Sequence, residues 1–446
     1  MLGETKIREL AARALAASTA DQTEVLVLGQ ESGLTRFANS TIHQNVAETN
    51  VELRVRVVLD KRIGVASTND LSPEAIERAV ETALTIAHFQ PQNPEFLSLP
   101  GPQPIPEANA WVERTAAFTP QERAQGVRVI CRRATEKGLI ASGAFSTGSY
   151  EIAVANSLGV FAYHPLTQAH LTTVIMADDS SGYASFTGLD ATEIVAEAIA
   201  QEAVEKALRG RHPVELEPGA YTVILEEHAV DDLLDMLAYL GFSALAVQEK
   251  RSFMGEKFGQ QIVGEKISIW DDGLDHSGIP VPFDFEGVPK QRVDLIVRGV
   301  ARAVVYDSYT AGREPGKRST GHALPAPNTY GPMPLNMFLA PGEATKEEMV
   351  ASTERGIWVT RFWYTNPVHP LKTIITGMTR DGTFLIERGE ITRPLKNLRF
   401  TQSILEALSN VEMIGRETRL EKSGFGANRV PALKITRFTF TGVTEF

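Results

Sequence analysis

The sequence predicts an α+β fold: an N-terminal α/β region of mixed helices and antiparallel strands, followed by a large β-rich C-terminal domain. Three observations support this prediction. Residues 51–57 alternate apolar and polar side chains, as a half-buried antiparallel strand does. A pattern of helix, strands and helix occurs twice before residue 215. After residue 261 strand-like segments dominate, and dense turn sequences separate them.

Length and composition limit the function classes. A chain of 446 residues is too long for one core, so about two or three domains are expected. The net charge of −11 argues against a nucleic-acid-binding surface, which needs concentrated Lys and Arg. The single cysteine, Cys131, excludes an intrachain disulfide and a Cys-rich zinc module. The N-terminus lacks the apolar core of a signal peptide, and no apolar run reaches membrane-spanning length. We therefore expect a cytoplasmic protein without membrane or nucleic-acid partners.

The first expected domain, residues 1–90, combines two helices with a strand-rich stretch. Lys6–Ala17 has apolar residues on one helical side. The second helix begins at Ser72, an N-cap residue followed by proline and an acid, and runs to about His88. The expected strands between them are residues 24–28, 51–57 and 63–67, with a hairpin turn at 59–62.

A proline-rich segment marks the clearest boundary. Residues 91–106 contain six prolines, which remove backbone donors and favour an extended linker. The middle segment, residues 107–215, follows as a second α+β unit or as a part of the first domain. Its expected elements are a helix with a capping box at Thr119–Glu122, strands within 139–176, and a helix from Asp190 to Gly210.

The third domain, residues 219–446, opens with a strand, Tyr221–Leu225, and a largely apolar helix from about Ala229. A helix this apolar is mostly buried, and Gly241 is expected to bend or end it. Further expected strands are residues 266–270, 291–308, 356–364, 371–378, 383–385 and 432–441. Turns are expected at 272–273, 341–342 and 381–382, and the one convincing late helix is 403–408.

Two groups of residues have the composition of metal ligands. His228 and Asp232 lie four residues apart at a helix start, a spacing that places them on one face. Asp271, Asp272, Asp275 and His276 form a denser acidic group. A zinc site needs three protein ligands, and the acidic group lacks the glutamate of a calcium loop. For His228 and Asp232 we therefore favour a histidine at a helix start beside an acid that complements the helix dipole. For the acidic group we favour a solvated turn. A metal site is the alternative in both places.

The single cysteine and a group of basic residues each have a structural and a functional interpretation. Cys131 lies inside the expected helix of the middle segment, next to Arg132 and Arg133, whose charges would lower the pKa of its thiol. A lone cysteine more often packs as a small apolar residue, and that interpretation is favoured. Arg313, Lys317, Arg318 and His322 form a basic patch on an acidic protein. A solvated turn is favoured there over capture of a carboxylate or of a partner's acidic surface.

Several phrases, taken together, resemble the TldD/PmbA (TldE) family, whose members were once described as modulators of DNA gyrase and are now viewed as peptidases. They span nearly the whole chain, and their order makes coincidence unlikely. The phrases are residues 36–43, 54–64, 71–75, 155–159, 218–223, 319–322, 333–336, 341–342, 356–359 and 384–391.

The resemblance implies two kinds of subunit. In the TldD kind, the helix after residue 225 carries His-Glu-x-x-x-His, in which the histidines bind zinc and the glutamate is the general base, and a cysteine near the C-terminus is a further ligand. This chain has no His-Glu pair. Asp235 and Leu240 stand at the histidine positions, Met236 at the base, and Ser423 in the phrase 423–428 at the cysteine.

The chain therefore resembles the PmbA/TldE kind: a metal-free subunit that pairs with a zinc-bearing TldD-like subunit in a cytoplasmic peptidase for unfolded peptides. No cofactor is then expected in this chain, and whether it forms a homodimer in isolation is open. Peptide or partner contacts are expected at Arg313, Arg318, His322 and Asn336. The alternatives are a stand-alone metallohydrolase, using His228, Asp232 and the group at 271–276, and a non-enzymatic peptide-binding or regulatory protein.

Overall fold

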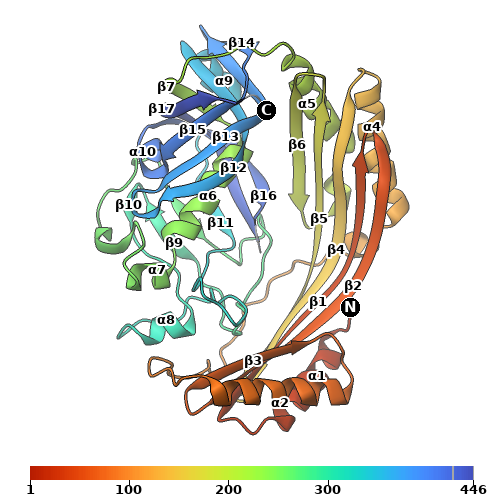
Figure 1. The fold of residues 1–446 in the computed structure, drawn as a ribbon, viewed down its shortest axis with the longest axis vertical. Coiled ribbons are helices and arrows are strands. Elements are labelled where there is room, and N and C mark those ends of the chain that lie inside the picture. The colour runs from red at the N-terminus through yellow and green to blue at the C-terminus, as the bar shows by residue number, and fades with distance from the viewer. Residues whose placement is uncertain (424–425, 445–446) are drawn as a thin grey trace.

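The computed structural model describes residues 1–423 and 426–444, and it shows two halves, each built around its own sheet (Figure 1). The first half holds an antiparallel sheet in the order β3-β2-β1-β4-β5-β6. Its strands are β1 (Gln22–Ala38), β2 (Thr41–Leu59), β3 (Arg62–Thr68), β4 (Ile140–Asn156), β5 (Phe161–Met176) and β6 (Ser181–Gly188). Its helices are α1 (Glu4–Ala17), α2 (Pro73–Phe89), α3 (Glu113–Ala116), α4 (Pro120–Thr135) and α5 (Ala196–Arg209).

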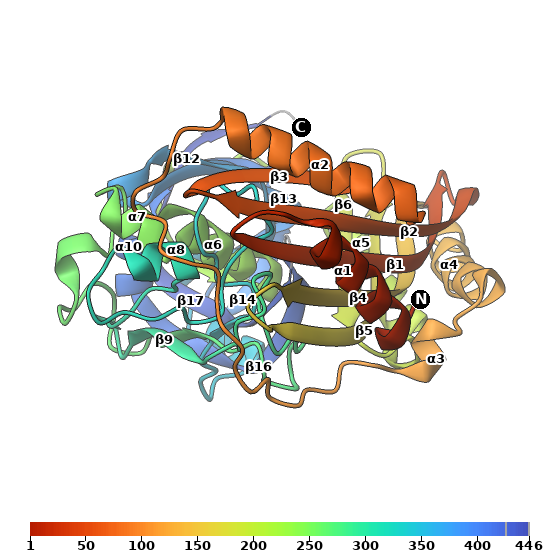
Figure 2. The same cartoon turned by 90° about the horizontal axis from the view of Figure 1, so that it is seen from below.

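The four longer helices cover one face of this sheet. α1 and α2 pack on apolar residues of β1 and β2, including Val25 and Val27, and α4 and α5 pack on Phe37, Phe145 and neighbours of the same face. Figure 2 shows α1 and α2 lying across the outside of the strands. The opposite face, which carries Leu26, is directed towards the second half of the molecule.

The helix starts follow the capping residues read from the sequence. Ser72 accepts a hydrogen bond from the N–H of Ala75, and Thr119 forms a reciprocal capping box with Glu122. The start expected at Asp190 needs correction: Asp190 caps a short 3₁₀ turn (Ala191–Glu193), and α5 begins only at Ala196.

β1 and β2 form a much longer hairpin than expected. The expected strands end at residue 28 and restart at 51, but pairing continues from Gln22↔Val58 to Ala38↔Thr41. Asn39 and Ser40 make the turn with positive φ angles of 51° and 56°. Side chains between residues 30 and 50 are largely polar and exposed, so they lack the apolar alternation that marks a strand, although the backbone pairs throughout.

The segments 1–90 and 107–215 contribute strands to a single sheet. β1 pairs with β4 over the registers Glu24↔Asn156 to Phe37↔Gly143. The proline-rich segment 91–106 contains no helix or strand and is fixed to the sheet at several points. One of these is the bond that the side chain of Asn156 donates to the carbonyl of Pro100.

The second half is built on an 11-stranded sheet that partly closes on itself. β17 pairs with β7 as well as with β15, so β7, β12, β13, β15 and β17 form a ring. The strands are β7 (Gly219–Leu225), β8 (Ile269–Asp271), β9 (Val293–Val297), β10 (Val300–Ala301), β11 (Met337–Leu339), β12 (Arg355–His369), β13 (Ile374–Glu387), β14 (Glu390–Pro394), β15 (Leu398–Ser403), β16 (Val411–Lys422) and β17 (Ala427–Val443). The helices are α6 (Glu227–Gly241), α7 (Ala244–Gln248), α8 (Ser308–Gly312), α9 (Lys346–Ala351) and α10 (Ile404–Ser409).

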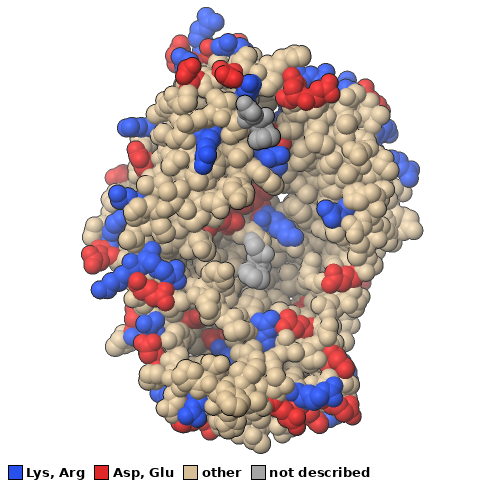
Figure 3. Space-filling view, in the orientation of Figure 1, with Lys and Arg blue, Asp and Glu red and all other residues tan. Residues whose placement is uncertain are grey.

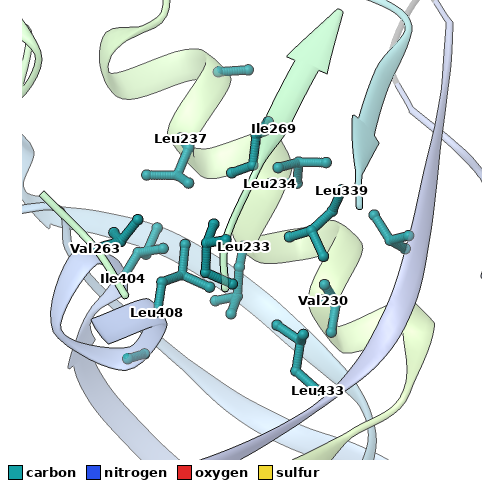
Figure 4. Close-up of a cluster of buried hydrophobic side chains, with 14 of the residues drawn as sticks. Val230, Leu233, Leu234, Leu237, Val263, Ile269, Leu339, Ile404, Leu408 and Leu433 are labelled. Carbon is teal, nitrogen blue, oxygen red and sulfur yellow. The ribbon is translucent and has the colours of Figure 1, made fainter. Parts of the chain in front are cut away.

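The expected buried helix is α6. It begins two residues earlier than predicted, at Glu227, and ends at Gly241. Figure 4 shows side chains of α6 directed into a cluster contributed by several other elements. Its labelled members are Val230, Leu233, Leu234, Leu237, Val263, Ile269, Leu339, Ile404, Leu408 and Leu433. Burial of this face is what holds α6 against the ring.

Several C-terminal expectations are wrong in detail. Residues 291–308 form β9, a turn at Arg298 and Gly299 with φ angles of 47° and 78°, β10 and the start of α8 rather than one strand. Asp381 and Gly382 lie inside β13 at a register shift opposite Val359 and Arg361, not in a chain-reversing turn. The short elements β11, α8 and α9 and the strands β14, β15 and β16 were not expected. Among the described residues, no helix has the length and apolar character needed to cross a bilayer.

Candidate functional site

The junction between β7 and α6 is fixed by two lysines and a tryptophan from three other elements. Glu226 is buried directly before α6 and accepts hydrogen bonds from Lys206 Nζ at 2.7 Å and Trp358 Nε1 at 2.6 Å. Burial acts to raise the pKa of Glu226, but Lys206 and Lys346 hold that pKa below its ordinary value. Glu227 pairs with Lys346 Nζ at 2.8 Å. The first turn of α6 is therefore held in one position.

One face of α6 carries carboxylates instead of core side chains. The side-chain amide of Asn428 donates to Asp231 Oδ1 at 2.9 Å and to Asp235 Oδ1 at 2.7 Å. Ser423 Oγ donates to the same Asp235 oxygen at 2.8 Å. The structure thus brings together Asp235 and Ser423, two of the predicted positions. Gly424 and Phe425, within the same phrase, lie outside the described residues.

The other two predicted positions do not belong to this group. Leu240 is 3% exposed and belongs to the apolar core, and Met236 packs against the edge of that core. Residues five apart on a helix are rotated by roughly 140°, so Asp235 and Leu240 face different surroundings. Asp231, four residues before Asp235, is the residue that shares its face. The sequence analysis did not identify Asp231 and Asn428 as neighbours of Asp235. The four-residue spacing from Asp231 to Asp235 and the presence of Asn428 in the phrase 423–428 were the signals that could have identified them.

The carboxyl groups on this face hold protons more tightly than ordinary acids. Burial and then the charge of Asp235 raise the pKa of Asp232 to about 7. The same two causes raise the pKa of Asp231 well above its ordinary value, and burial raises that of Asp235. Of the three, Asp232 is the one whose pKa is brought to about neutral.

His228 does not pair with Asp232. Its Nδ1 lies 2.8 Å from Glu421 Oε1 on β16, and its ring packs edge-on against Tyr183 on β6. The Nε2 atom of His228 is buried and has no hydrogen-bond partner among the described residues. His228 therefore joins α6 to both sheets, and the alternative of a metal site shared by His228 and Asp232 has no support in these contacts.

The acidic group at 271–276 is dispersed. Asp271 is fully buried and accepts hydrogen bonds from His322 Nε2 and from the backbone N–H of Asn336, both at 2.7 Å. Asp272 and Asp275 accept hydrogen bonds from N–H groups of their own turns, and His276 is exposed. Asp272 and Asp275 thus form turns, as the favoured interpretation holds, whereas Asp271 does not lie in a solvated turn and is instead buried in a hydrogen-bonded group with His322 and Asn336.

The four residues expected to bind a peptide or a partner lie in two places. His322 and Asn336 are buried together around Asp271. Arg313 pairs with Glu95 at 3.2 Å beside the proline-rich segment, and Arg318 is exposed on the loop after α8. The structure therefore does not unite them in one site.

Cys131 packs against the core of the first half, and burial raises the pKa of its thiol. That direction is opposite to the lowered pKa of a reactive cysteine.

Two cavities lie between the halves. The first, of about 630 Å³, is lined by β6, the region before α5, and β16. The second, of about 470 Å³, lies between the inner face of the first sheet and the loops around residues 279–290. The hollow near the centre of Figure 3 is reached by both acidic and basic side chains. Volumes of this order suit small ligands.

Comparison with known proteins decides the family. Three domain models match in succession: the PmbA/TldA metallopeptidase domain 1 at residues 23–87, the central domain at 100–211 and the C-terminal domain at 218–442. This chain belongs to the PmbA/TldD family.

Relatives and solved structures of the PmbA/TldD family match over most of their length. Metalloprotease PmbA of Escherichia coli O157:H7 is 26% identical, over 94% of this chain and 93% of that protein. A metalloprotease TldD homolog of Haemophilus influenzae is 24% identical, over 87% and 86%. The crystal structure of TldE from Thermococcus kodakarensis has a TM-score of 0.90 at 20% identity, covering 98% of this chain and all of that one. A Thermotoga maritima protein described as a modulator of a DNA gyrase has a TM-score of 0.87 at 20% identity, with the same coverage.

The PmbA/TldD family raises the question of a zinc ion, and the residues on α6 do not fit one. Asp235, Ser423 and Asn428 are bonded to one another, while Met236 and Leu240 lack the nitrogen, oxygen or thiolate donors that zinc takes. Within residues 1–423 and 426–444, no three His, Cys, Asp or Glu side chains are grouped so as to hold a metal. We therefore assign no step through a metal to this chain.

Proposed function

We propose that this chain is the metal-free, PmbA/TldE-like subunit of a cytoplasmic metallopeptidase complex, in which a TldD-like partner supplies the zinc and the complex processes unfolded peptides. The observation that carries the proposal is the bonding of Asp235 to Ser423 and Asn428 on the helix where the TldD kind would hold its metal. These contacts satisfy the polar groups internally and leave no ligand set for zinc.

In the proposed complex, this chain supplies part of the wall of the peptide chamber. Its α6 helix packs into the core through its apolar face, whereas the other face carries acids where the TldD kind would hold its metal. The three carboxyl groups on that face have raised pKa values, so the face is far less negative near neutral pH than three ordinary acids would make it.

The first test is metal content together with activity. We expect the purified full-length chain to contain zinc far below one equivalent and to leave an unfolded peptide such as casein fragments uncleaved. Adding a family member that carries His-Glu-x-x-x-His should restore cleavage, and the two chains should elute together in size-exclusion chromatography. Elemental analysis and a fluorescent-casein assay provide the two readouts.

Variants of this chain separate the alternatives. Asp235→Ala and Ser423→Ala should leave the cleavage rate of the two-chain mixture within about threefold, because these residues take no part in chemistry. Cleavage by the lone chain that a chelator abolishes, together with one metal per chain lost in His228→Ala, would instead establish a stand-alone metallohydrolase. Peptide binding without any cleavage, in the presence of a zinc-bearing partner, would favour the non-enzymatic role.

A further inference from the structure

A buried lysine lines the cavity of about 470 Å³ between the two halves and has no hydrogen-bond partner. Lys290 is 4% exposed, and its Nζ makes no hydrogen bond to any described residue. An ammonium group has three donors, and leaving them unsatisfied in a buried position costs free energy unless a ligand or water accepts from them. Lys290 is therefore the most unusual charged group in this cavity.

The two carboxylates nearest to Lys290 are committed to other donors. Both oxygens of Asp271 accept hydrogen bonds, one from His322 and one from the N–H of Asn336. Asp284 accepts from the backbone N–H groups of Glu286 and Val288 at one oxygen and of Ala323 at the other, each at 2.9 Å. These acids place negative charge near Lys290 without bonding to it. Burial outweighs their charge and lowers the pKa of Lys290.

The opposite wall of the cavity is a row of side chains across the first sheet. Asn50, Gln30, Tyr150 and Leu166 are directly paired positions on β2, β1, β4 and β5. All four line the cavity, as does Gln168 farther along β5. The carboxamides of Gln30, Asn50 and Gln168 have no hydrogen-bond partner in the described part of the chain. A carboxamide both donates and accepts, which matches the N–H and C=O groups of a peptide.

The remaining wall is apolar. Phe283 is buried, and Phe285, Ile279 and Val281 extend the apolar surface from the loop of the second half. The cavity is therefore lined by a lysine, by carboxamides on the side of the first sheet and by aromatic and aliphatic side chains from the loop of the second half. Its volume lies within the range of roughly 300–1,000 Å³ that is common for small-ligand pockets.

We propose that this cavity binds the free C-terminal carboxylate of a short peptide, with the carboxylate on Lys290 Nζ, the peptide groups along the carboxamide row and an apolar side chain against Phe283. A carboxylate supplies the acceptor that the ammonium lacks, and a charge-assisted hydrogen bond is stronger than a neutral one. The site is separate from the acidic face of α6. The proposal does not rest on the proposed subunit role, because the site needs neither a partner chain nor a metal.

The test is a calorimetric titration of the isolated full-length chain with N-acetyl-phenylalanyl-glycine and with its C-terminal amide. We expect the acid to bind in one site and the amide to bind at least tenfold more weakly, because the amide cannot give Lys290 a charged acceptor. Equal affinity for acid and amide, or no saturable binding of the acid at 10 mM peptide, would overturn the proposal.

A pair of lysine variants completes the test. Lys290→Met should weaken binding of the acid at least tenfold and leave the melting temperature unchanged or higher, since Nζ makes no internal bond. Lys434→Met is the matched control: Lys434 is equally buried but its Nζ bonds to Ser352, outside the cavity. It should lower the melting temperature and leave binding unchanged. Retained binding in Lys290→Met, or a melting temperature lowered as much as in Lys434→Met, counts against the proposal.

Discussion

At the scale of single residues, α6 carries three carboxyl groups on the side that faces away from the apolar core. Asp231 and Asp235 share the amide of Asn428, whereas the side chain of Asp232 accepts no hydrogen bond among the described residues. The nearest compensation for Asp232 is the charge of Arg361, which lowers its pKa less than burial and Asp235 raise it. The charge of Asp232 therefore destabilises the fold without compensation from a hydrogen bond to any described residue.

Asp232→Asn should stabilise the chain at pH 8 and not at pH 4. The pKa of Asp232 is raised from an ordinary 3.8 to about 7. Between these values the folded chain holds a proton that the unfolded chain has lost, so stability falls as pH rises through this window and stays low above it. Asparagine cannot ionise and avoids this loss. We expect a gain of about 1 kcal/mol at pH 8, discounted because the side chain is only half-buried.

Urea unfolding at pH 4, 6 and 8 measures this difference. Glu81→Gln on the exposed side of α2 is the control and should shift stability little at any of these values. A gain for Asp232→Asn that is the same at pH 4 and pH 8 would show that the effect does not come from ionisation.

At the scale of elements, α6 has two faces with different duties. The apolar face holds the helix in the ring of strands, and the acidic face is hydrogen-bonded to Ser423 and Asn428. The helix keeps its place because its core contacts are extensive, so the acidic face tolerates changes that the core face does not.

Leu237→Ala should cost about 2–5 kcal/mol of stability, because it removes a fully buried side chain and leaves a cavity in the core. Tyr239→Ala, on the same helix but 46% exposed, should cost about 1 kcal/mol or less. Chemical unfolding monitored by circular dichroism compares the two. Similar losses in both variants would mean that α6 is not anchored through its apolar face.

At the scale of the whole molecule, buried ion pairs join the two halves. Arg56 on β2 contacts Glu24 on β1 at 2.5 Å and Glu286, from the second half, at 3.0 Å. Burial raises the pKa of Glu24 to about 7 although Arg56 opposes it. One arginine thus serves two buried carboxylates across the junction.

Arg56→Met should destabilise the chain by about 3–5 kcal/mol at pH 8, because it leaves buried carboxylates without their cation. The loss should shrink at pH 5, where Glu24 is protonated and neutral in the folded chain. Scanning calorimetry at both pH values tests this expectation. Arg62→Met on β3, away from these carboxylates, should show a small and pH-independent effect. A larger loss at pH 5 than at pH 8 would contradict the assigned role of Arg56.

The sequence by itself determined features that depend on neighbours along the chain. Local patterns of apolar and capping residues predict the α+β class and the helix caps at Ser72 and Thr119. They also predict the strand before α6 and the burial of that helix. The family resemblance likewise depends on the order of short phrases, and the domain matches confirm it.

Only the tertiary structure decided which distant residues meet. The parts of β1 and β2 between residues 30 and 50 show no apolar alternation in the sequence. They are strands because their backbones pair with each other along the hairpin. Asn428 reaches Asp231 and Asp235 across nearly 200 positions of sequence, and Lys290 is unusual only because Asp271 and Asp284 are already bonded elsewhere. Periodicity and capping act over a few residues, whereas sheet pairing, burial and the competition for hydrogen-bond partners are set by the packing of the whole chain.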